Sequence, residues 1–232
     1  MQDYIHYTDH LFQNIDDPAI AVNWRVRKRP VYRLMDNKQW LDNFFNQGEL
    51  ALSCLSKLRS YPDEVRGDKD EGDALIWFEN DKGDTQAFKY ESGLNAYVFC
   101  TTLELNNQVI KDFNAVGAVK IHNPTYFGAE VMKSISGCDQ GIEGECIYDD
   151  SRVYKGYSDK MKALLGTKNF LQNPMLAQEL MNAACERELF LKLNKYEAQK
   201  EFRMLWFTDQ TVDSNIIIKC PGAVRFCERI DF

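Results

Sequence analysis

The chain has 232 residues, 44% hydrophobic and 12% aromatic, which is enough to fill a sizeable core and excludes a wholly disordered protein. Its 28 basic and 35 acidic side chains give a formal net charge of -7, which excludes a surface coated with positive charge for general nucleic-acid binding. A local basic patch remains compatible with this balance.

The first residues, MQDYIHYTDHLFQ, contain no basic region followed by an apolar run, and no apolar stretch has membrane-spanning length. We therefore expect a cytoplasmic protein without a membrane partner. Seven cysteines form an odd set with no CxxC pair, and three histidines show no metal spacing. These patterns predict reduced thiols and no metal site.

The chain shows no repeat and no linker rich in Pro or Gly, which predicts a single domain. We expect residues 1–30 to form an N-terminal extension, with some helical character before residue 25, and residues 31–232 to form the domain itself. The extension ends in a basic run, Arg25 to Arg29. A solvated surface segment is the first interpretation of this run, and a phosphate contact through Arg27 is the second.

The start of the domain is expected to alternate strand, helix and strand. VYRLM is typical of a short strand, Asp36 with Gln39 resembles a capping box, and Gly48 stands where a helix would end. ELALS follows as the second strand.

The next segment, Arg59 to Asp73, has too few apolar residues to belong to a core. A polar segment of this length inside a compact domain is usually mobile or functional. Arg66 and Tyr61 are therefore candidates for substrate contacts, and an exposed loop rich in both charges is the equally weighted alternative.

Strands dominate the remainder. The pattern predicts a hairpin over IWFEN and TQAFKYES and further strands at NAYVFCTTLE, AVGAVKIHN and GECIYDD. A long helix is expected from Asn173-Pro174 to about Asn194, followed by strands at KEFRMLWF, NIIIKC and AVRFCERI. Many strands with few helices indicate the α+β class.

Three short pieces carry polar groups that could do chemistry: Arg33, Cys100-Thr101-Thr102 and Gln199-Lys200-Glu201. Because side chains two apart on a strand share a face, Gln199, Glu201 and Arg203 are expected opposite the apolar face of Phe202, Met204 and Trp206. Each piece alone has an ordinary interpretation. For Glu201 it is an ion pair with Arg203.

In this order, the three pieces resemble the ADP-ribosyltransferase superfamily, whose Arg/Ser/Glu branch has an Arg on the first strand, a Ser-Thr-Ser-like strand end and a Gln-x-Glu or Glu-x-Glu on a late strand. KYEAQKEFRMLW, with LALS, looks like an uncharacterised microbial family linked to that superfamily. The resemblance spans about Val31 to Trp206, and Cys100 stands where serine is expected. It implies an α+β fold of split mixed or antiparallel sheets with flanking helices.

The resemblance also implies an NAD-dependent transferase. Arg33 would bind the diphosphate of NAD, since a planar guanidinium matches two phosphate oxygens. A hydroxyl from Thr101, Thr102 or Ser53 would hold the ribose. Glu201 would stabilise the positive charge that develops on the sugar as nicotinamide leaves.

Gln199 would face the acceptor, and a glutamine there resembles transferases whose acceptor is not arginine. We expect a macromolecular acceptor, with RNA or DNA ahead of protein and RNA first. The nearest analogues, nucleic-acid-modifying toxins of anti-phage systems, imply a toxin with an antitoxin partner.

Two other classes stay open. A metal-dependent nuclease would use the acid-x-basic strand Glu201-Phe202-Arg203, although arginine is a poor substitute for the lysine usually expected there. In a non-catalytic interaction protein the same residues would be structural. Convergence of Arg33, Thr101 and Glu201 on one cleft would favour the transferase.

Overall fold

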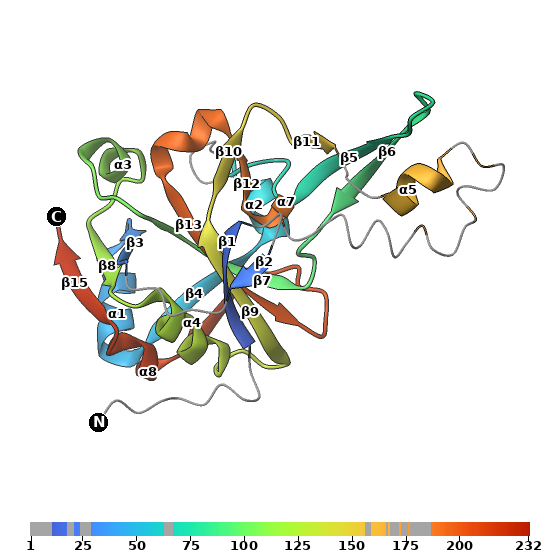
Figure 1. Ribbon diagram of the computed structural model, residues 1–232. Helices are drawn as coiled ribbons and strands as arrows, with labels where there is room; N and C mark the ends of the chain where they lie inside the picture. The colour runs from blue at the N-terminus through green and yellow to red at the C-terminus, as the bar shows by residue number, and fades with distance from the viewer. Residues whose placement is uncertain are drawn as a thin grey trace.

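The computed structural model describes residues 11–17, 21–23, 29–62, 67–155, 159–165, 167, 172, 176 and 187–232. Strands dominate these residues and helices flank them, which confirms the α+β class (Figure 1). No helix within these ranges is long and apolar enough to cross a bilayer. Arg27 and Arg66 lie outside the described residues, as does most of the stretch 173–186.

Strands and helices follow one another without regular alternation. Their bounds in chain order are β1 (Leu11–Asp17), β2 (Ala21–Asn23), β3 (Val31–Met35), α1 (Lys38–Gln47), β4 (Glu49–Cys54), α2 (Leu55–Ser60), β5 (Asp73–Glu79), β6 (Thr85–Glu91), β7 (Ala96–Thr102), α3 (Asn107–Asp112), β8 (Gly117–Ile121), α4 (Pro124–Met132), β9 (Cys138–Glu145), β10 (Ile147–Asp149), β11 (Val153–Lys155), α5 (Asp159–Leu164), α7 (Arg187–Phe190), β12 (Leu191–Leu193), the 3₁₀ helix η2 (Asn194–Gln199), β13 (Glu201–Thr208), β14 (Ile216–Lys219), α8 (Pro221–Val224) and β15 (Cys227–Asp231).

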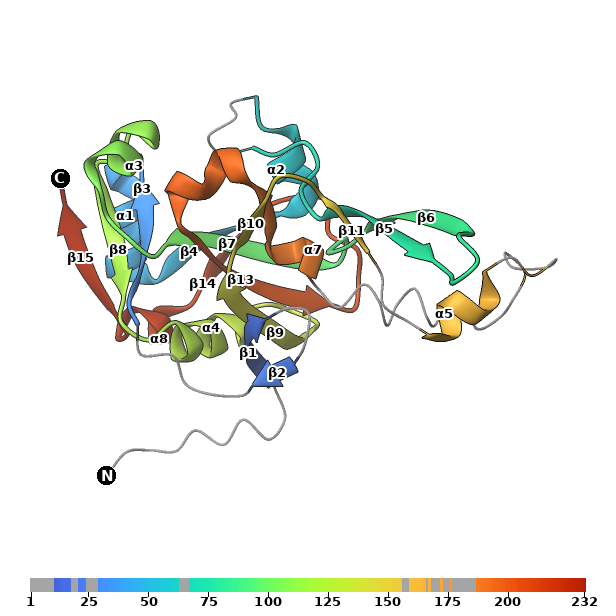
Figure 2. The same ribbon diagram turned by 45° about the horizontal axis from the view of Figure 1, so that its top comes forward.

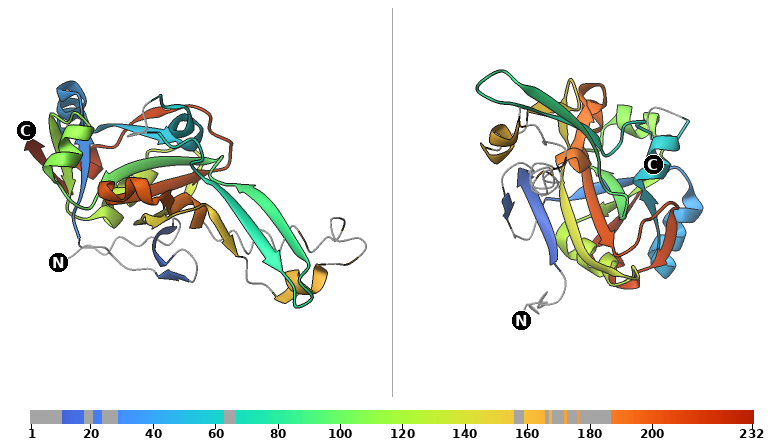
Figure 3. Two further views of the ribbon diagram at one scale, coloured as in Figure 1. Left: turned by 90° about the horizontal axis from the view of Figure 1, so that it is seen from above. Right: turned by 90° about the vertical axis from the view of Figure 1, so that its right-hand side faces the viewer.

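The main sheet has the order β15-β8-β3-β7-β13-β9-β1-β2, and β4 with β14 joins it at β7. Its neighbours are antiparallel except for β1 and β9, which run parallel. Two smaller sheets are formed by β10 with β12 and by β11, β5 and β6. The β5–β6 hairpin projects away from the main sheet (Figure 3).

The main sheet divides along one edge of β7. β3 pairs with β7 near its end, through Tyr32 and Thr102, whereas β4 pairs nearer its start, through Ser53 with Val98. The opposite edge of β7 is taken along its whole length by β13. β3 and β4 therefore share an edge and diverge from it, so that β3 turns away while β4 runs beside β7 (Figure 2).

Helix α1 bridges the two diverging strands. Its cap is Asn37, whose side chain accepts a hydrogen bond from the amide of Gln39 at 2.8 Å, so the predicted cap at Asp36 is wrong by one residue. The helix ends at Gly48, as predicted, because the left-handed φ of 71° there lets the amide return to the last carbonyls of the helix. Phe44 anchors α1 in the core.

The core lies on both faces of β13. The apolar face predicted for this strand is confirmed, since Phe202, Met204 and Trp206 are buried in the larger cluster. The opposite face is also covered: Leu205 packs in a second cluster with Leu189 and its neighbours. Both faces of β13 are therefore buried, and any charge on the second face must be accommodated away from water.

Two predicted helical segments differ from the structure. The described parts of residues 1–24 are strands β1 and β2, and β1 joins the main sheet beside β9. The long helix expected to end near Asn194 gives way after Phe190 to β12, which pairs in parallel with β10, and then to η2. This pairing overrides the helical spacing of leucines in the sequence.

Two glycines with left-handed φ differ in how closely other atoms approach them. Replacing each by alanine therefore tests how tightly the chain at Gly48 packs against α8. Gly48 and Gly83 have φ of 71° and 83°, but a Cβ at Gly48 would lie 2.5 Å from the backbone nitrogen of Pro221, whereas nothing lies within 4 Å at Gly83. We expect Gly83→Ala to lower the free energy of unfolding by about 1–2 kcal/mol and Gly48→Ala by roughly 3 kcal/mol, in urea titrations. Equal losses would contradict the close approach.

Candidate active site

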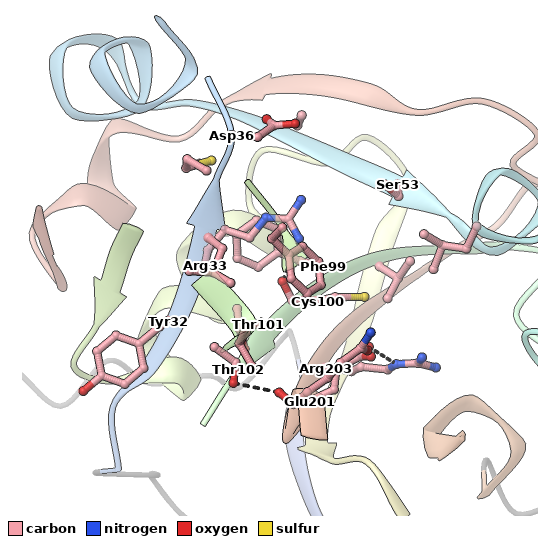
Figure 4. A pocket seen from close by; sticks show the side chains of 18 of the residues that line it. Tyr32, Arg33, Asp36, Ser53, Phe99, Cys100, Thr101, Thr102, Glu201 and Arg203 are labelled. Carbon is pink, nitrogen blue, oxygen red and sulfur yellow. Dashed lines mark hydrogen bonds and ion pairs between the residues drawn. The ribbon is translucent and has the colours of Figure 1, made fainter. Parts of the chain in front are cut away.

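The gap between β3 and β4 holds a cavity of about 250 Å³ above the exposed edge of β7 (Figure 4). Residues from distant parts of the sequence line it. Of the candidate residues that the structure describes, all contribute: Arg33, Ser53, Tyr61, Thr101, Thr102, Gln199 and Glu201. The fold thus brings together the three pieces that the sequence places far apart.

Arg33 reaches the cavity from β3. Its Nη1 donates to the carbonyl oxygen of Cys100 at 2.8 Å, in the part of β7 that neither β3 nor β4 covers. Its guanidinium carbon lies 5.0 Å from the centre of the Phe99 ring. Among the described residues Arg33 makes no ion pair, and its buried Nε has no hydrogen-bond partner. Its positive charge is therefore open to an anion in the cavity.

The candidate hydroxyls differ in what they already bind. Thr101 Oγ1 donates to the carbonyl of Phe202 at 2.9 Å, and Thr102 Oγ1 lies 2.8 Å from the carbonyl of Gln199. Both threonines therefore tie β7 to neighbouring elements, Thr101 to β13 and Thr102 to the last residue of η2. Ser53 and Tyr61 line the β4 side of the cavity, and a ligand could use their hydroxyls without breaking that tie.

Cys100 lines the cavity at the position where the family resemblance places a serine. Burial, together with the negative charge of Glu201, raises the pKa of this thiol to about 12. The thiol therefore stays protonated near neutral pH. It can act as a weak hydrogen-bond donor, but it is a poor nucleophile.

Glu201 is the first residue of β13 and lies opposite Thr102 in the register. Its Oε1 accepts from Arg203 Nε and its Oε2 from Lys192 Nζ, both at 2.6 Å. Burial alone would raise the pKa of this carboxyl, but the two cations hold it well below its usual range. Glu201 is therefore ionised at neutral pH and is suited to stabilising positive charge rather than to donating a proton.

The ion pair between Glu201 and Arg203 belongs to a larger buried network. Arg203 has no exposed surface, and its two terminal nitrogens bind Glu71 Oε1 and Oε2 at 2.6 and 2.9 Å. Glu71 comes from the polar segment for which an exposed loop was one of two interpretations, yet only 2% of its surface is exposed. The exposed-loop alternative is therefore wrong for this end of the segment.

Lys192 completes the network on the cavity side. Its Nζ donates to Gln199 Oε1 at 3.0 Å as well as to Glu201, and it lies 4.6 Å from the centre of the Tyr196 ring. Burial would lower the pKa of this amine, but the charge of Glu201 raises it, so Lys192 stays protonated. One ammonium thus links the carboxylate and amide that the sequence singled out.

Gln199 does not lie on the strand predicted for it. It ends η2, and Lys200 takes a left-handed φ of 43° before β13 begins at Glu201. The alternation of side chains along a strand therefore does not explain why Gln199 and Glu201 lie together. The two side chains lie together because both accept a hydrogen bond from the ammonium of Lys192.

Sequence reasoning missed Glu71 and Lys192. Glu71 lies in a run of mixed charges, DKDEGD, with no periodicity to mark a buried residue, and Lys192 lies where a helix was expected. Both positions follow from long-range pairing: Glu71 through Arg203, and Lys192 through the contact of β12 with β10. The one signal for a second carboxylate was Arg203 itself, because a guanidinium buried beside Glu201 needs acceptors for its terminal nitrogens as well.

No family model, curated protein or solved structure matches the chain. In the part of the chain that the structure describes, no three His, Cys, Asp or Glu side chains are grouped as a metal site requires.

The buried position of Glu201 predicts a pH-dependent contribution to stability. At pH 7 we expect Glu201→Gln to lower the free energy of unfolding by about 3–5 kcal/mol, because it leaves two buried cations under-compensated. Since the pKa of the folded carboxyl lies below the ordinary value of 4.5, this contribution is complete above that value and is lost as the pH falls below it. Urea titrations of both proteins across this range measure the difference.

The matched control is Glu197→Gln, which removes a carboxylate that is 57% exposed and pairs with Lys200. We expect a change of less than about 0.5 kcal/mol. A difference between wild type and Glu201→Gln that stays constant from pH 7 to about 3 would contradict the depressed pKa.

Proposed function

We propose that the protein is an NAD-dependent ADP-ribosyltransferase of the Arg/Ser/Glu type, with the corresponding α+β fold. The observation that carries this proposal is the convergence of Arg33 and Glu201 on one cavity, from strands β3 and β13, which are far apart in sequence and lie on either side of β7. Hydroxyls of Ser53, Thr101 and Thr102 line the same cavity. A cation, an anion and hydroxyls are the groups that a charged, sugar-containing dinucleotide needs.

The cation supports the binding of a diphosphate. Arg33 makes no ion pair with the described residues, and its buried Nε lacks a partner, which suits a group that brings several acceptor oxygens. The cavity, about 250 Å³, is smaller than the ~300–1,000 Å³ usual for drug-sized ligands. We therefore place the nicotinamide and its ribose inside, with the diphosphate at Arg33 and the remainder of NAD reaching out.

The anion supports the chemistry. When the bond between ribose C1′ and the nicotinamide nitrogen breaks, the electron pair goes to the nitrogen, and positive charge develops on the sugar. Nicotinamide leaves as a neutral molecule without protonation, so no general acid is needed. The ionised Glu201 stabilises the developing charge, and its oxygens retain lone pairs for a ribose hydroxyl beside the bonds from Arg203 and Lys192.

The acceptor then attacks C1′ from the open side and releases a proton to solvent. We propose nucleic acid, RNA before DNA and protein, because Gln199 beside Glu201 resembles the residue of transferases with acceptors other than arginine. A toxin in anti-phage defence, with an antitoxin partner, is the setting proposed by the same resemblance. Of the basic run Arg25 to Arg29, the structure describes Arg29. This residue pairs on the surface with Glu145 at 3.6 Å and so adds little support for a contact with nucleic acid.

A purely structural network is the competing function. It is favoured by the two cations that already occupy both oxygens of Glu201. Such a network would need Arg203, Lys192 and Glu71, but it gives no role to Arg33, which belongs to none of these pairs.

The transferase proposal is tested by transfer of label from NAD. Wild-type protein is incubated with NAD carrying label in the adenylate and with separate pools of RNA, DNA and protein. We expect label in the RNA pool, reduced by roughly a hundredfold or more in Glu201→Gln, because the neutral amide cannot compensate the sugar cation. Label in no pool, or equal label from both proteins, would contradict the proposal.

Arg33 gives a second test, of binding. We expect Arg33→Met to raise the KM for NAD by roughly tenfold or more, with a smaller change in kcat, because a charged pair to phosphate is lost. The control, Arg225→Met, also removes one positive charge, but from an exposed pair with Glu130 outside the cavity. Similar kinetics in the two variants would argue against a phosphate site at Arg33.

A further inference from the structure

Glu71 reaches Arg203 from the polar segment Arg59 to Asp73, which is remote in sequence from β13. Arg203 Nη1 and Nη2 each bind one oxygen of Glu71, a bidentate pair, and Nη1 also donates to the carbonyl of Leu189 at 2.6 Å. Only Nε is directed at Glu201. The guanidinium is therefore held at its terminal nitrogens by one carboxylate and presents a single donor to the other.

We propose that Glu71 is a positioning residue for Glu201, acting through Arg203; this inference rests on the proposed transferase function. A guanidinium without such a partner forms two parallel bonds with a nearby carboxylate. Arg203 would then cover both oxygens of Glu201. By occupying the terminal nitrogens, Glu71 restricts Arg203 to Oε1 and leaves Oε2 to the cavity side, where Lys192 and Gln199 lie.

The charge balance of the buried cluster also supports a role for Glu71 beside Glu201. Glu71, Glu201, Arg203 and Lys192 together sum to zero, with Arg203 shared between the two carboxylates. If Glu71 were neutral, the cluster would carry one net positive charge beside the sugar. Such a charge opposes the cation that develops on the ribose, and burial makes the opposition stronger.

The backbone around Glu71 is built to hold this carboxylate still. Arg59 Nε donates to the carbonyl of Glu71 at 2.6 Å, and the amide of Glu71 donates to the carbonyl of Asp68 at 3.1 Å. Gly72 follows with a φ of 75°, and a Cβ there would lie 2.9 Å from the carbonyl oxygen of Ser92. The turn fits closely against β6 and delivers Glu71 from a rigid support.

The test separates positioning from general loop stability. In Glu71→Gln we expect kcat for NAD-dependent labelling to fall roughly ten- to a hundredfold, while the Kd for NAD, measured by calorimetry, changes less than about threefold. Asp68→Asn is the matched control. Asp68 lies in the same turn, is 5% exposed and does not contact Arg203. It pairs with Arg152, whose Nη2 also lies 4.0 Å from Glu71 Oε1. Asp68→Asn therefore perturbs the same turn and its charges without removing the carboxylate that holds Arg203. We expect its kcat to stay within about threefold of wild type.

The possible results distinguish failure of the proposed function from failure of the positioning role. No labelling by wild type overturns the proposed function, and this inference with it. An active wild type with an equally active Glu71→Gln overturns the positioning role alone, as does an equal loss of kcat in Asp68→Asn. A Kd that weakens as much as kcat falls would also overturn it.

A second variant covers the case in which Glu71→Gln does not fold. Glu71→Met combined with Arg203→Met replaces the buried pair by apolar side chains, a change that proteins often tolerate. We expect this protein to fold and bind NAD, because the cluster stays neutral, and we expect kcat to fall because Oε1 of Glu201 loses the donor that Glu71 holds in place. Turnover at the wild-type rate would overturn the inference.

Discussion

The side chain of Arg203 carries a charge with no access to solvent, and the rest of the site follows from how that charge is compensated. A buried guanidinium is tolerated only if its donors and its charge are both satisfied. Glu71, Glu201 and the Leu189 carbonyl supply the acceptors, and each comes from a different element of the fold. Compensating one arginine thus fixes the polar segment, β13 and α7 relative to one another.

The second constraint is the division of the main sheet along β7. One edge of this strand is paired along its whole length, while the other is shared by β3 and β4 with a gap between them. The gap leaves a backbone carbonyl to Arg33 and opens a cavity toward Glu201. A cation open to an anion on one wall faces a buried, ionised carboxylate on the other, and the proposed NAD site is built on this opposition.

The sequence predicted the local parts of this arrangement well. The strand–helix–strand opening with its helix end at Gly48, the β5–β6 hairpin and the apolar face of β13 are confirmed, because each depends on periodicity or on a turn residue. The cap at Asp36, the strand position of Gln199 and the predicted end of the late helix near Asn194 were wrong, because long-range pairing or a local turn overrode the pattern. Glu71 and Lys192 were out of reach for the same reason: their partners are set only by tertiary structure.

We propose that Arg33 and Glu201 bind two parts of one ligand, the diphosphate and the nicotinamide ribose of NAD. The most direct measurement is a crystal structure of the Glu201→Gln variant grown with NAD, since slow turnover preserves the dinucleotide. We expect the diphosphate to lie against the guanidinium of Arg33 and a ribose hydroxyl to make a hydrogen bond with the side chain at position 201. NAD bound elsewhere, or a cavity between β3 and β4 that stays closed to it, would contradict the account.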